Sequence, residues 1–316
     1  MPATTTPSAA DPPSPGVATV DVAVVIPAHN TAEYLAQTLD TVAAQTVRPA
    51  EVVVVDDRST DGTGDIAAGH AIGAKVVRGT FGTAAKTRHA GVEASSAAWI
   101  AFLDSDDLWD NDYLESAMRC IEAAPDDVVA CVSHRRDLVV ESGDIEPTPR
   151  MKLDEGTAVV DMAAMRRLVP TRPLNFSTSG QVVRRASYVE VGGFDGEHVQ
   201  VEDVELMLRL AKRGPWAYVD EPKWTYRRGR PGNLSGARAR GVCDSLKAHL
   251  KHRDAYDSPA WRAAQRYRAE RALGMALRTD DAAHRAMAFE LALPLVSWPK
   301  RQAFRLRRML KGGGHG

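Results

Sequence analysis

Short apolar runs alternate with segments of helical periodicity along the first two-thirds of the chain. Residues 21–27, 51–55 and 99–103 are rich in β-branched and aromatic residues, which is typical of strands buried on both faces of a sheet. Between them, apolar residues in 34–45 recur every three or four positions, which predicts a helix, and a second helix is expected at 66–70. Strands that alternate with helices favour an α/β domain with a mostly parallel, doubly wound sheet.

The same alternation continues further along the chain. It predicts additional elements at 75–78, 113–121, 128–132, 217–221 and 225–228. Residues 137–173 have mixed polarity and scattered prolines, so we expect surface excursions that contribute substrate specificity. From about residue 237 to 289 the chain is rich in Ala and Arg and is predicted to be helical. His249 and His252 in this segment are expected to be solvent-exposed.

These patterns divide the chain into three parts. Residues 1–19 are rich in Pro, Ala, Ser and Thr and are predicted to be a disordered tail. Residues 20–235 form the α/β domain, and residues 236–316 form a helical, basic C-terminal extension.

The charge is unevenly distributed, although the formal net charge of the 316-residue chain is −1. Residues 1–222 contain 19 Lys or Arg and 34 Asp or Glu, which gives −15, whereas residues 223–316 contain 21 and 7, which gives +14. The basic part is therefore expected to face phosphates or an anionic surface. Residues 299–310, with five basic residues between apolar ones, could lie on an anionic membrane, although a solvated terminal helix fits equally well.

The three cysteines have no metal-ligand spacing, and the N-terminus does not read as a secretory signal. The most apolar late stretch, 286–298, is too short to span a bilayer. We therefore expect a cytoplasmic protein, peripheral to the membrane if the tail binds lipid.

Three carboxylates follow the apolar run 99–103. Side chains alternate along an extended segment, so Asp104 and Asp106 are expected to point the same way, with Asp107 beside them. Like charges this close repel unless a cation lies between them, and oxygen ligands suit Mg²⁺ or Mn²⁺. A polar turn with a capping Asp is the alternative interpretation.

Two further residues are candidates for chemistry. Arg88, in a predicted helix, could meet a phosphate or could be an ordinary solvated charge. Asp203 opens another predicted helix, where the dipole favours a carboxylate, although Asp there is often a cap. Residues 79–86 lack the Walker A pattern, and Gly62-x-Gly64 lacks the third glycine of a dinucleotide fingerprint, so those nucleotide-binding classes are not supported.

Five short motifs in a fixed order resemble the family 2 glycosyltransferases, inverting enzymes with the GT-A fold. The resemblance covers about residues 20–230 and rests on Val25-Ile-Pro-Ala-His-Asn30, Val54-Val-Asp-Asp-Arg-Ser-Thr-Asp-Gly62, Phe102-Leu-Asp-Ser-Asp-Asp107, Gly192-Gly-Phe-Asp195 and Glu202-Asp203. It implies a Rossmann-like mixed sheet flanked by helices and transfer of a sugar from a nucleotide-diphosphate sugar to an acceptor hydroxyl.

The resemblance also assigns roles to residues. Asp57 would hold the nucleobase beside the backbone of Pro27 and Ala28, and Asp104 and Ser105 would contact the ribose or donor sugar. The remaining roles are Arg88 in donor binding, Asp106 as ligand of Mn²⁺ or Mg²⁺, and Asp203 as catalytic base. Glu202 is the adjacent competitor for the base.

The sequence departs from the family at two places. The family's Ala-Arg-Asn segment reads Thr87-Arg88-His89, and its histidine-containing loop reads Arg227-Arg228-Gly229-Arg230. The donor is expected to be a UDP-sugar, the acceptor is unidentified, and nucleic acid is not expected as a partner. A sugar-nucleotide-forming nucleotidyltransferase and a non-catalytic binding module are the alternatives.

Overall fold

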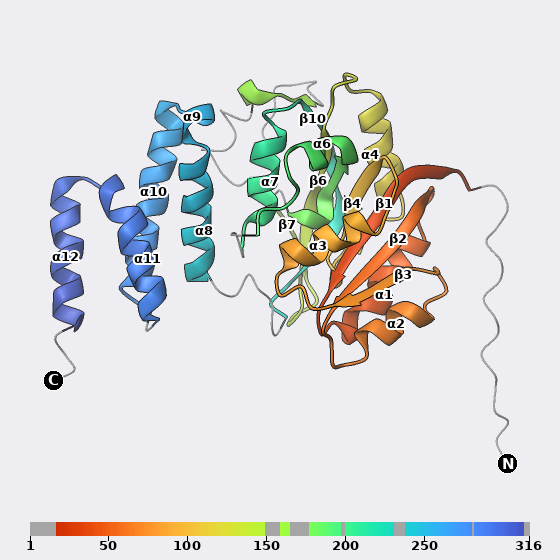
Figure 1. The fold of residues 1–316 in the computed structure, drawn as a ribbon, viewed down its shortest axis with the longest axis horizontal. Coiled ribbons are helices and arrows are strands. Elements are labelled where there is room, and N and C mark those ends of the chain that lie inside the picture. The colour runs from red at the N-terminus through yellow and green to blue at the C-terminus, as the bar shows by residue number, and fades with distance from the viewer. Residues whose placement is uncertain are drawn as a thin grey trace, which may run out of the picture.

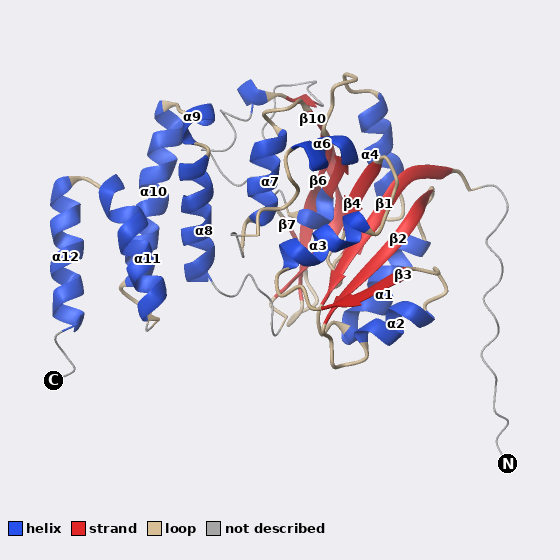
Figure 2. Cartoon of the chain, in the orientation of Figure 1, coloured by secondary structure: helices blue, strands red, loops and turns tan. Residues whose placement is uncertain are grey.

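The computed structural model describes residues 17–148, 159–164, 177–196, 200–230, 238–279 and 281–312. Its centre is a mixed sheet in the order β3-β2-β1-β4-β9-β6-β10-β5, with β7 beside β6 and β8 beside β10 (Figures 1 and 2). The strands are β1 (Thr19–Ala28), β2 (Arg48–Asp57), β3 (Lys75–Gly79), β4 (Trp99–Phe102), β5 (Leu108–Trp109), β6 (Ala130–Val139), β7 (Ile145–Pro147), β8 (Val159–Val160), β9 (Gln181–Arg184) and β10 (Trp216–Arg228).

The first four strands of this order are parallel and are joined by helices, as the sequence pattern predicts. The helices of this part are α1 (Ala32–Ala43), α2 (Thr63–Gly69), α3 (Ala84–Glu93), α4 (Tyr113–Glu122), α6 (Arg185–Glu190) and α7 (Glu202–Leu210). Strand β9 was not predicted; it lies antiparallel between β4 and β6 and makes the sheet mixed. It therefore joins the parallel N-terminal strands to β6 and β10.

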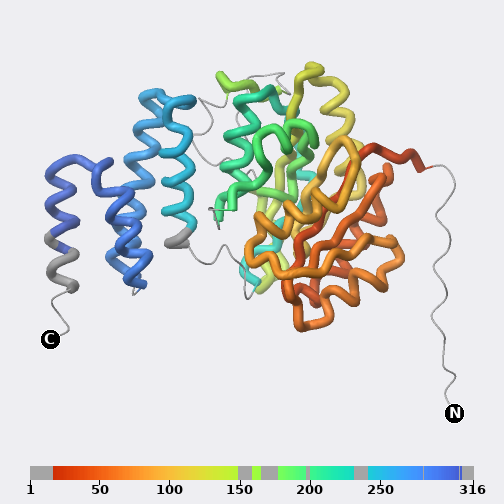
Figure 3. Tube along the Cα trace, in the orientation of Figure 1, coloured from red at the N-terminus to blue at the C-terminus, as the bar shows by residue number. Residues whose placement is uncertain are grey.

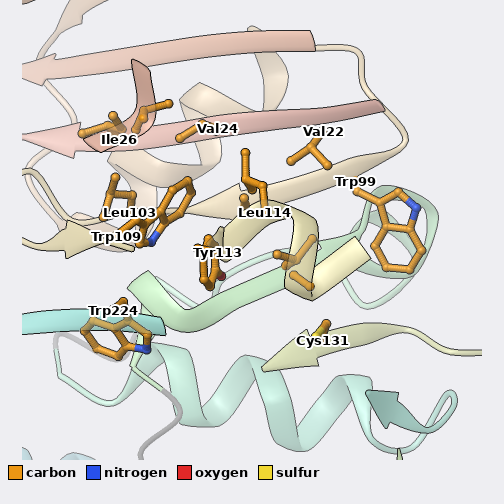
Figure 4. Close-up of a cluster of buried hydrophobic side chains, with 14 of the residues drawn as sticks. Val22, Val24, Ile26, Trp99, Leu103, Trp109, Tyr113, Leu114, Cys131 and Trp224 are labelled. Carbon is orange, nitrogen blue, oxygen red and sulfur yellow. The ribbon is translucent and has the colours of Figure 1, made fainter. Parts of the chain in front are cut away.

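The sheet has a hydrophobic core on each face because side chains alternate along its strands. On one face Val22, Val24 and Ile26 of β1 pack with residues of α1 and α4, including Tyr113 and Leu114 (Figure 4). On the other face Val25 packs with residues of α3, α6 and α7. Packed helices therefore cover both faces of the sheet.

The C-terminal extension is helical, as predicted, but is divided into separate helices that lie at one end of the molecule (Figure 3). They are α8 (Arg238–Lys251), α9 (Arg253–Tyr256), α10 (Pro259–Ala276), α11 (Ala282–Ala292) and α12 (Trp298–Gly312). Residues of α8, α10 and α11 form a third hydrophobic core. Tyr256 and Trp261 instead belong to the core that contains α7, so the extension packs directly on the α/β part of the chain.

The expectation that His249 and His252 are solvated is wrong, because both are buried. His249 stacks on Trp261 with ring centroids 4.4 Å apart, and His252 contacts Glu205 of α7. The sequence predicts one helix for both residues, whereas the structure places His249 in α8 and His252 between α8 and α9, where it packs against α7.

Two strand predictions also need correction. The segments 217–221 and 225–228 form one strand, β10, which continues through Pro222 with register shifts on either side of that residue.

The predicted tail reaches Thr19, which is already in β1, and residues 1–16 lie outside the described residues. The boundary at 235/236 also falls outside them, so the division of domains stays a prediction.

In the portion of the chain that the structure describes, no helix is both long enough and apolar enough to cross a membrane.

Candidate active site

Asp104, Asp106 and Asp107 lie in a turn and not on an extended strand. Strand β4 ends at Phe102, and the N–H of Asp107 donates to the carbonyl oxygen of Asp104 at 3.0 Å. The expectation that these residues lie on an extended segment is therefore wrong, and alternation along a strand does not apply to Asp104 and Asp106. The reason is local: after Phe102 the chain leaves the sheet and closes the tight turn 104–107.

Neighbouring side chains fix this acidic turn. The hydroxyl of Thr38 in α1 donates to the carbonyl oxygens of Ser105 and Asp107, at 3.1 and 2.9 Å. The Ser179 hydroxyl donates to Oδ2 of Asp107 at 2.6 Å and accepts from the N–H of Asp104 at 3.0 Å. Ser105, assigned to donor binding, is itself buried. These contacts fix the conformation of the turn.

Arg88 connects the acidic turn to the segment that contains Asp203. Its guanidinium donates to Oδ1 of Asp104 at 2.6 Å and to Oε1 of Glu202 at 2.7 Å. Burial disfavours the charged form, but the two carboxylates outweigh it and raise the pKa of Arg88. Arg88 is buried, which excludes the alternative interpretation of a solvated helix charge. The bridge brings residues 202–203 next to Asp104.

Asp203 and Glu202 have different environments at the start of α7. Glu202 is buried and paired with Arg88, whereas Asp203 is half-buried. Burial, and next the charge of Glu202, raise the pKa of Asp203 to about 7. A carboxyl with such a pKa can accept a proton near neutral pH, which is the property of a general base.

Two arginines from the end of β10 lie over the acidic turn. Nε of Arg230 pairs with Oδ2 of Asp106, and Arg227 donates to the carbonyl oxygen of Asp106 and to Gln37. Both guanidinium groups lie near the ring of Tyr34, 5.2 Å for Arg227 and 5.7 Å for Arg230. The end of β10 and the residues after it therefore place positive charge beside the acidic turn.

The acidic turn carries more negative charge than it easily accommodates. Burial raises the pKa of Asp106 against the opposing effect of Arg230, and Asp104 adds to the increase. Burial, with Asp106 and Asp104, raises the pKa of Asp107 well above its usual range. A site with these properties is stabilised by an additional cation.

The residues of this turn fit a divalent cation that arrives with a phosphate ligand. Among the residues described, no group of three His, Cys, Asp or Glu side chains converges as a complete metal site. Mg²⁺ and Mn²⁺, however, need only one or two carboxylates when substrate phosphates complete the coordination. The pair with Arg230 involves one oxygen of Asp106, and the carboxylate has a second.

Asp57 lies at the same edge of the sheet. Ala28 at the end of β1 pairs with Asp56 of β2, so Pro27, Ala28 and Asp57 are neighbours there. Oδ1 of Asp57 accepts from the N–H of Phe81, and Oδ2 accepts from that of Gly82. Burial opposes ionisation of Asp57, but these bonds and Arg58 outweigh it and lower the pKa of the carboxyl. Asp57 is therefore an ionised acceptor near Pro27 and Ala28.

Sequence analysis missed several residues that shape this site. Glu202 was considered only as a competitor of Asp203 and not as the partner of Arg88. Ser179 follows no recognisable motif, and its contact with Asp107 depends on the unpredicted strand β9. The basic run Arg227–Arg230 was noted in the sequence, but its contact with Asp106 could not be predicted from it.

These features combine a Rossmann-like sheet, an acidic turn after a central strand and a second acidic segment joined to it through Arg88. They define a glycosyltransferase with the GT-A fold, which uses a nucleotide sugar as donor. The family described as "Glycosyl transferase family 2" matches residues 23–186, which is more than half of the chain. The chain belongs to that family, as the sequence motifs predict.

Similar proteins support this assignment. The amylovoran biosynthesis glycosyltransferase AmsB of Erwinia amylovora is 23% identical over 267 residues, 79% of this chain and 85% of AmsB. Validoxylamine A glucosyltransferase of Streptomyces hygroscopicus subsp. limoneus is 32% identical over 231 residues, 64% of this chain but 50% of that enzyme. The chain thus spans most of the first relative and half of the second.

Solved structures agree on the fold. S. aureus TarS 1–349 in complex with UDP-GlcNAc superposes with a TM-score of 0.67 at 18% identity, covering 91% of this chain and 87% of that one. The mannosyltransferase of Pyrobaculum calidifontis in complex with GDP-Man and Mn²⁺ superposes with a TM-score of 0.53 at 21% identity, covering 93% and 89%. At these identities the likeness concerns the fold alone.

Proposed function

We propose that the protein transfers a sugar, with inversion, from a nucleotide diphosphate to an acceptor hydroxyl, and that Asp203 is the catalytic base. The observation that carries the proposal is the Arg88 bridge, because it joins Asp104 in the acidic turn to Glu202, the neighbour of Asp203. A donor held at the acidic turn would therefore lie close to Asp203. A single displacement needs one base carboxylate, and no second carboxylate nucleophile.

The choice of Asp203 over Glu202 follows from their environments. Neighbouring side chains on a helix diverge by about 100°, so only one of the two faces the donor. Glu202 accepts a hydrogen bond from Arg88 and is held in that ion pair. The pKa of Asp203, about 7, suits removal of a proton from the attacking hydroxyl.

In this proposal the donor lies along the edge of the sheet. Asp57 binds the nucleobase beside Pro27 and Ala28, and Asp104 and Ser105 contact the ribose or donor sugar. Asp106 is the residue that would hold a divalent cation, which would supply charge to neutralise the leaving diphosphate. Arg227 and Arg230 add positive charge on the same side. Their role substitutes for that of the histidine-containing loop of the family.

The donor is proposed to be a UDP-sugar. An ionised Asp57 accepts a hydrogen bond from a base N–H, which suits uracil but also thymine or guanine. TarS was solved with UDP-GlcNAc, and the Pyrobaculum mannosyltransferase with GDP-Man and Mn²⁺, so both nucleotides need testing.

A peripheral membrane contact is a second proposal, favoured by one observation. Trp298, at the start of α12, is 68% exposed and is followed by Lys300 and Arg301. Exposed Trp beside basic residues suits the interface of an anionic bilayer.

The nucleotide is identified by thermal stabilisation with UDP, GDP and dTDP, each with Mn²⁺ or with EDTA. We expect the greatest increase in melting temperature with UDP and Mn²⁺. UDP-GlcNAc and GDP-mannose then serve as donors in an assay for released nucleoside diphosphate. Release of pyrophosphate from a nucleoside triphosphate, without release of UDP or GDP from either sugar nucleotide, would contradict sugar transfer.

A further inference from the structure

A buried cluster of charges joins α7 to the C-terminal extension. Glu205, two residues after Asp203, has no exposed surface. Its carboxylate pairs with Arg209 of α7, at 2.6 Å, and with two residues of the extension: Lys251 Nζ at 2.9 Å and His252 Nε2 at 3.0 Å. Burial opposes ionisation, but these partners hold the pKa of Glu205 well below its usual range. A buried carboxylate with three partners fixes the relative position of the elements that supply them.

The chemistry of the partners defines the tautomer of His252. Nδ1 lies 2.9 Å from Nζ of Lys212, and an ammonium group can only donate, so Nδ1 accepts. The proton is therefore on Nε2, which donates to Oε1 of Glu205. Burial lowers the pKa of His252, which favours this neutral ring. The ring thus transmits a directional contact from Lys212 to Glu205.

The extension also holds the chain on the other side of Asp203. Lys251 Nζ lies 2.5 Å from Oδ2 of Asp195, in the Gly-Gly-Phe-Asp turn. The N–H of Gln200 donates to Oδ2 of Asp244 in α8 at 3.2 Å. Lys251 therefore links the turn before Asp203 to the helix that begins with it, and α7 lies between the sheet and α8 (Figure 1).

Backbone strain marks the same place. Val201, at the N-cap of α7, has φ +65°, a left-handed conformation that β-branched residues rarely adopt. Strain of this kind persists only where surrounding contacts determine the backbone. The contacts of Gln200 and Glu205 with the extension enclose Val201 on both sides.

We propose that the C-terminal extension positions the catalytic base, and that Lys251 and His252 are its positioning residues. The inference rests on the proposed role of Asp203 and adds a role for the extension. By fixing Asp195 and Glu205, the extension fixes the backbone at 201–203 and therefore the direction of the Asp203 carboxylate. A small misplacement of a reacting group lowers the rate strongly, on the order of 10²-fold for 1 Å.

The test uses Lys251→Met in the full chain, because Met keeps the apolar stem and removes the charge. We expect faster amide hydrogen exchange in peptides covering 200–210 and about a tenfold lower kcat for release of UDP from UDP-GlcNAc, or of GDP from GDP-mannose. The affinity for UDP or GDP should stay within about twofold, because the donor site does not include Lys251. Lys251→Arg, which keeps the positive charge, should restore most of the kcat.

Lys300→Met is the matched control, since Lys300 also pairs with an acid of the extension, Glu270 at 2.6 Å, away from α7. It should change neither exchange in α7 nor kcat. An unchanged kcat in Lys251→Met, with or without faster exchange, would overturn the inference. So would a fall in kcat matched by an equal loss of nucleotide affinity. If Asp203→Asn loses turnover while Lys251→Met keeps it, only this inference fails; if Asp203→Asn keeps turnover, the assignment of the base fails.

Discussion

Asp203→Asn should inactivate the enzyme and stabilise its fold at the same time. The substitution removes a carboxylate that the folded protein holds with a raised pKa, about 7, against 3.8 for an ordinary Asp. Asn keeps the shape but cannot accept a proton. Loss of a positioned general base typically costs ~10²–10⁴ in rate, so we expect a fall in turnover of that order.

The sign of the stability change follows from proton binding. Between pH 3.8 and about 7 the folded state holds a proton on Asp203 that the unfolded state has lost. The stability of the native protein therefore falls as pH rises through this window. A pKa difference of about three units changes the free energy of unfolding by at most about 4 kcal/mol, at about 1.4 kcal/mol per unit. The Asn amide must also be desolvated. We therefore expect the free energy of unfolding of Asp203→Asn to exceed that of the native protein by ~1–3 kcal/mol at pH 8 and to be almost equal to it at pH 4.

Urea unfolding at pH 4, 6 and 8 measures this difference in the native protein and in the variant. The change should appear in the midpoint and not in the slope, since the surface exposed on unfolding is the same. In parallel, kcat/KM for release of the nucleoside diphosphate should fall below pH 7 in the native protein, because protonated Asp203 cannot act as base.

Glu202→Gln provides a control of opposite sign. It weakens the buried ion pair with Arg88, and we expect it to lower the free energy of unfolding by about 2 kcal/mol or more at pH 8. A gain of stability for Asp203→Asn that is equal at pH 4 and pH 8 would refute the electrostatic reasoning. If Asp203→Asn keeps near-normal turnover and Glu202→Gln does not, the base is Glu202.

Three further predictions concern other parts of the chain. Asp106→Ala should abolish Mn²⁺-dependent binding of UDP; equal affinity of the native protein in EDTA and in Mn²⁺ would contradict this. Gly193→Ala should lower the unfolding free energy by about 2 kcal/mol, because φ is +67° and the new Cβ would lie 2.8 Å from the Tyr188 hydroxyl; an unchanged urea midpoint would refute it. Truncation after Ser297 should abolish co-sedimentation with anionic vesicles, and equal sedimentation of both forms would exclude the tail as an anchor.

The fold was predictable as far as local pattern determines it. Apolar runs identified the strands β1, β2 and β4, which are buried on both faces. Helical spacing of apolar residues identified α1 and α4, which each bury one face. Strand β9 follows residues of mixed polarity and has four residues, so its pairing between β4 and β6 depends on long-range contacts. Antiparallel insertion of such a short strand leaves no periodic signal.

The sequence predicted which residues form the candidate site, but not which of their side chains form ion pairs with one another. The motifs pointed to Asp104, Asp106 and Asp203, and these lie at one end of the sheet or are joined to it through Arg88. Two ion pairs, of Arg88 with Glu202 and of Arg230 with Asp106, depend on how segments distant in the sequence pack together. Likewise His252 was expected to be solvated, and only tertiary packing reveals Glu205 opposite it.

The Arg88 bridge also has a consequence for synthesis of the chain on the ribosome. Asp104 is 16 residues beyond Arg88, whereas Glu202 is 114 residues beyond it. At ~5–20 residues per second, the second carboxylate is made about 5–20 s after the first. During that interval the strands β1 to β4 and the acidic turn exist without Asp203. On the proposed role of Asp203, a nascent chain at this stage lacks the catalytic base, which is added only when α7 has been made and joined to Arg88.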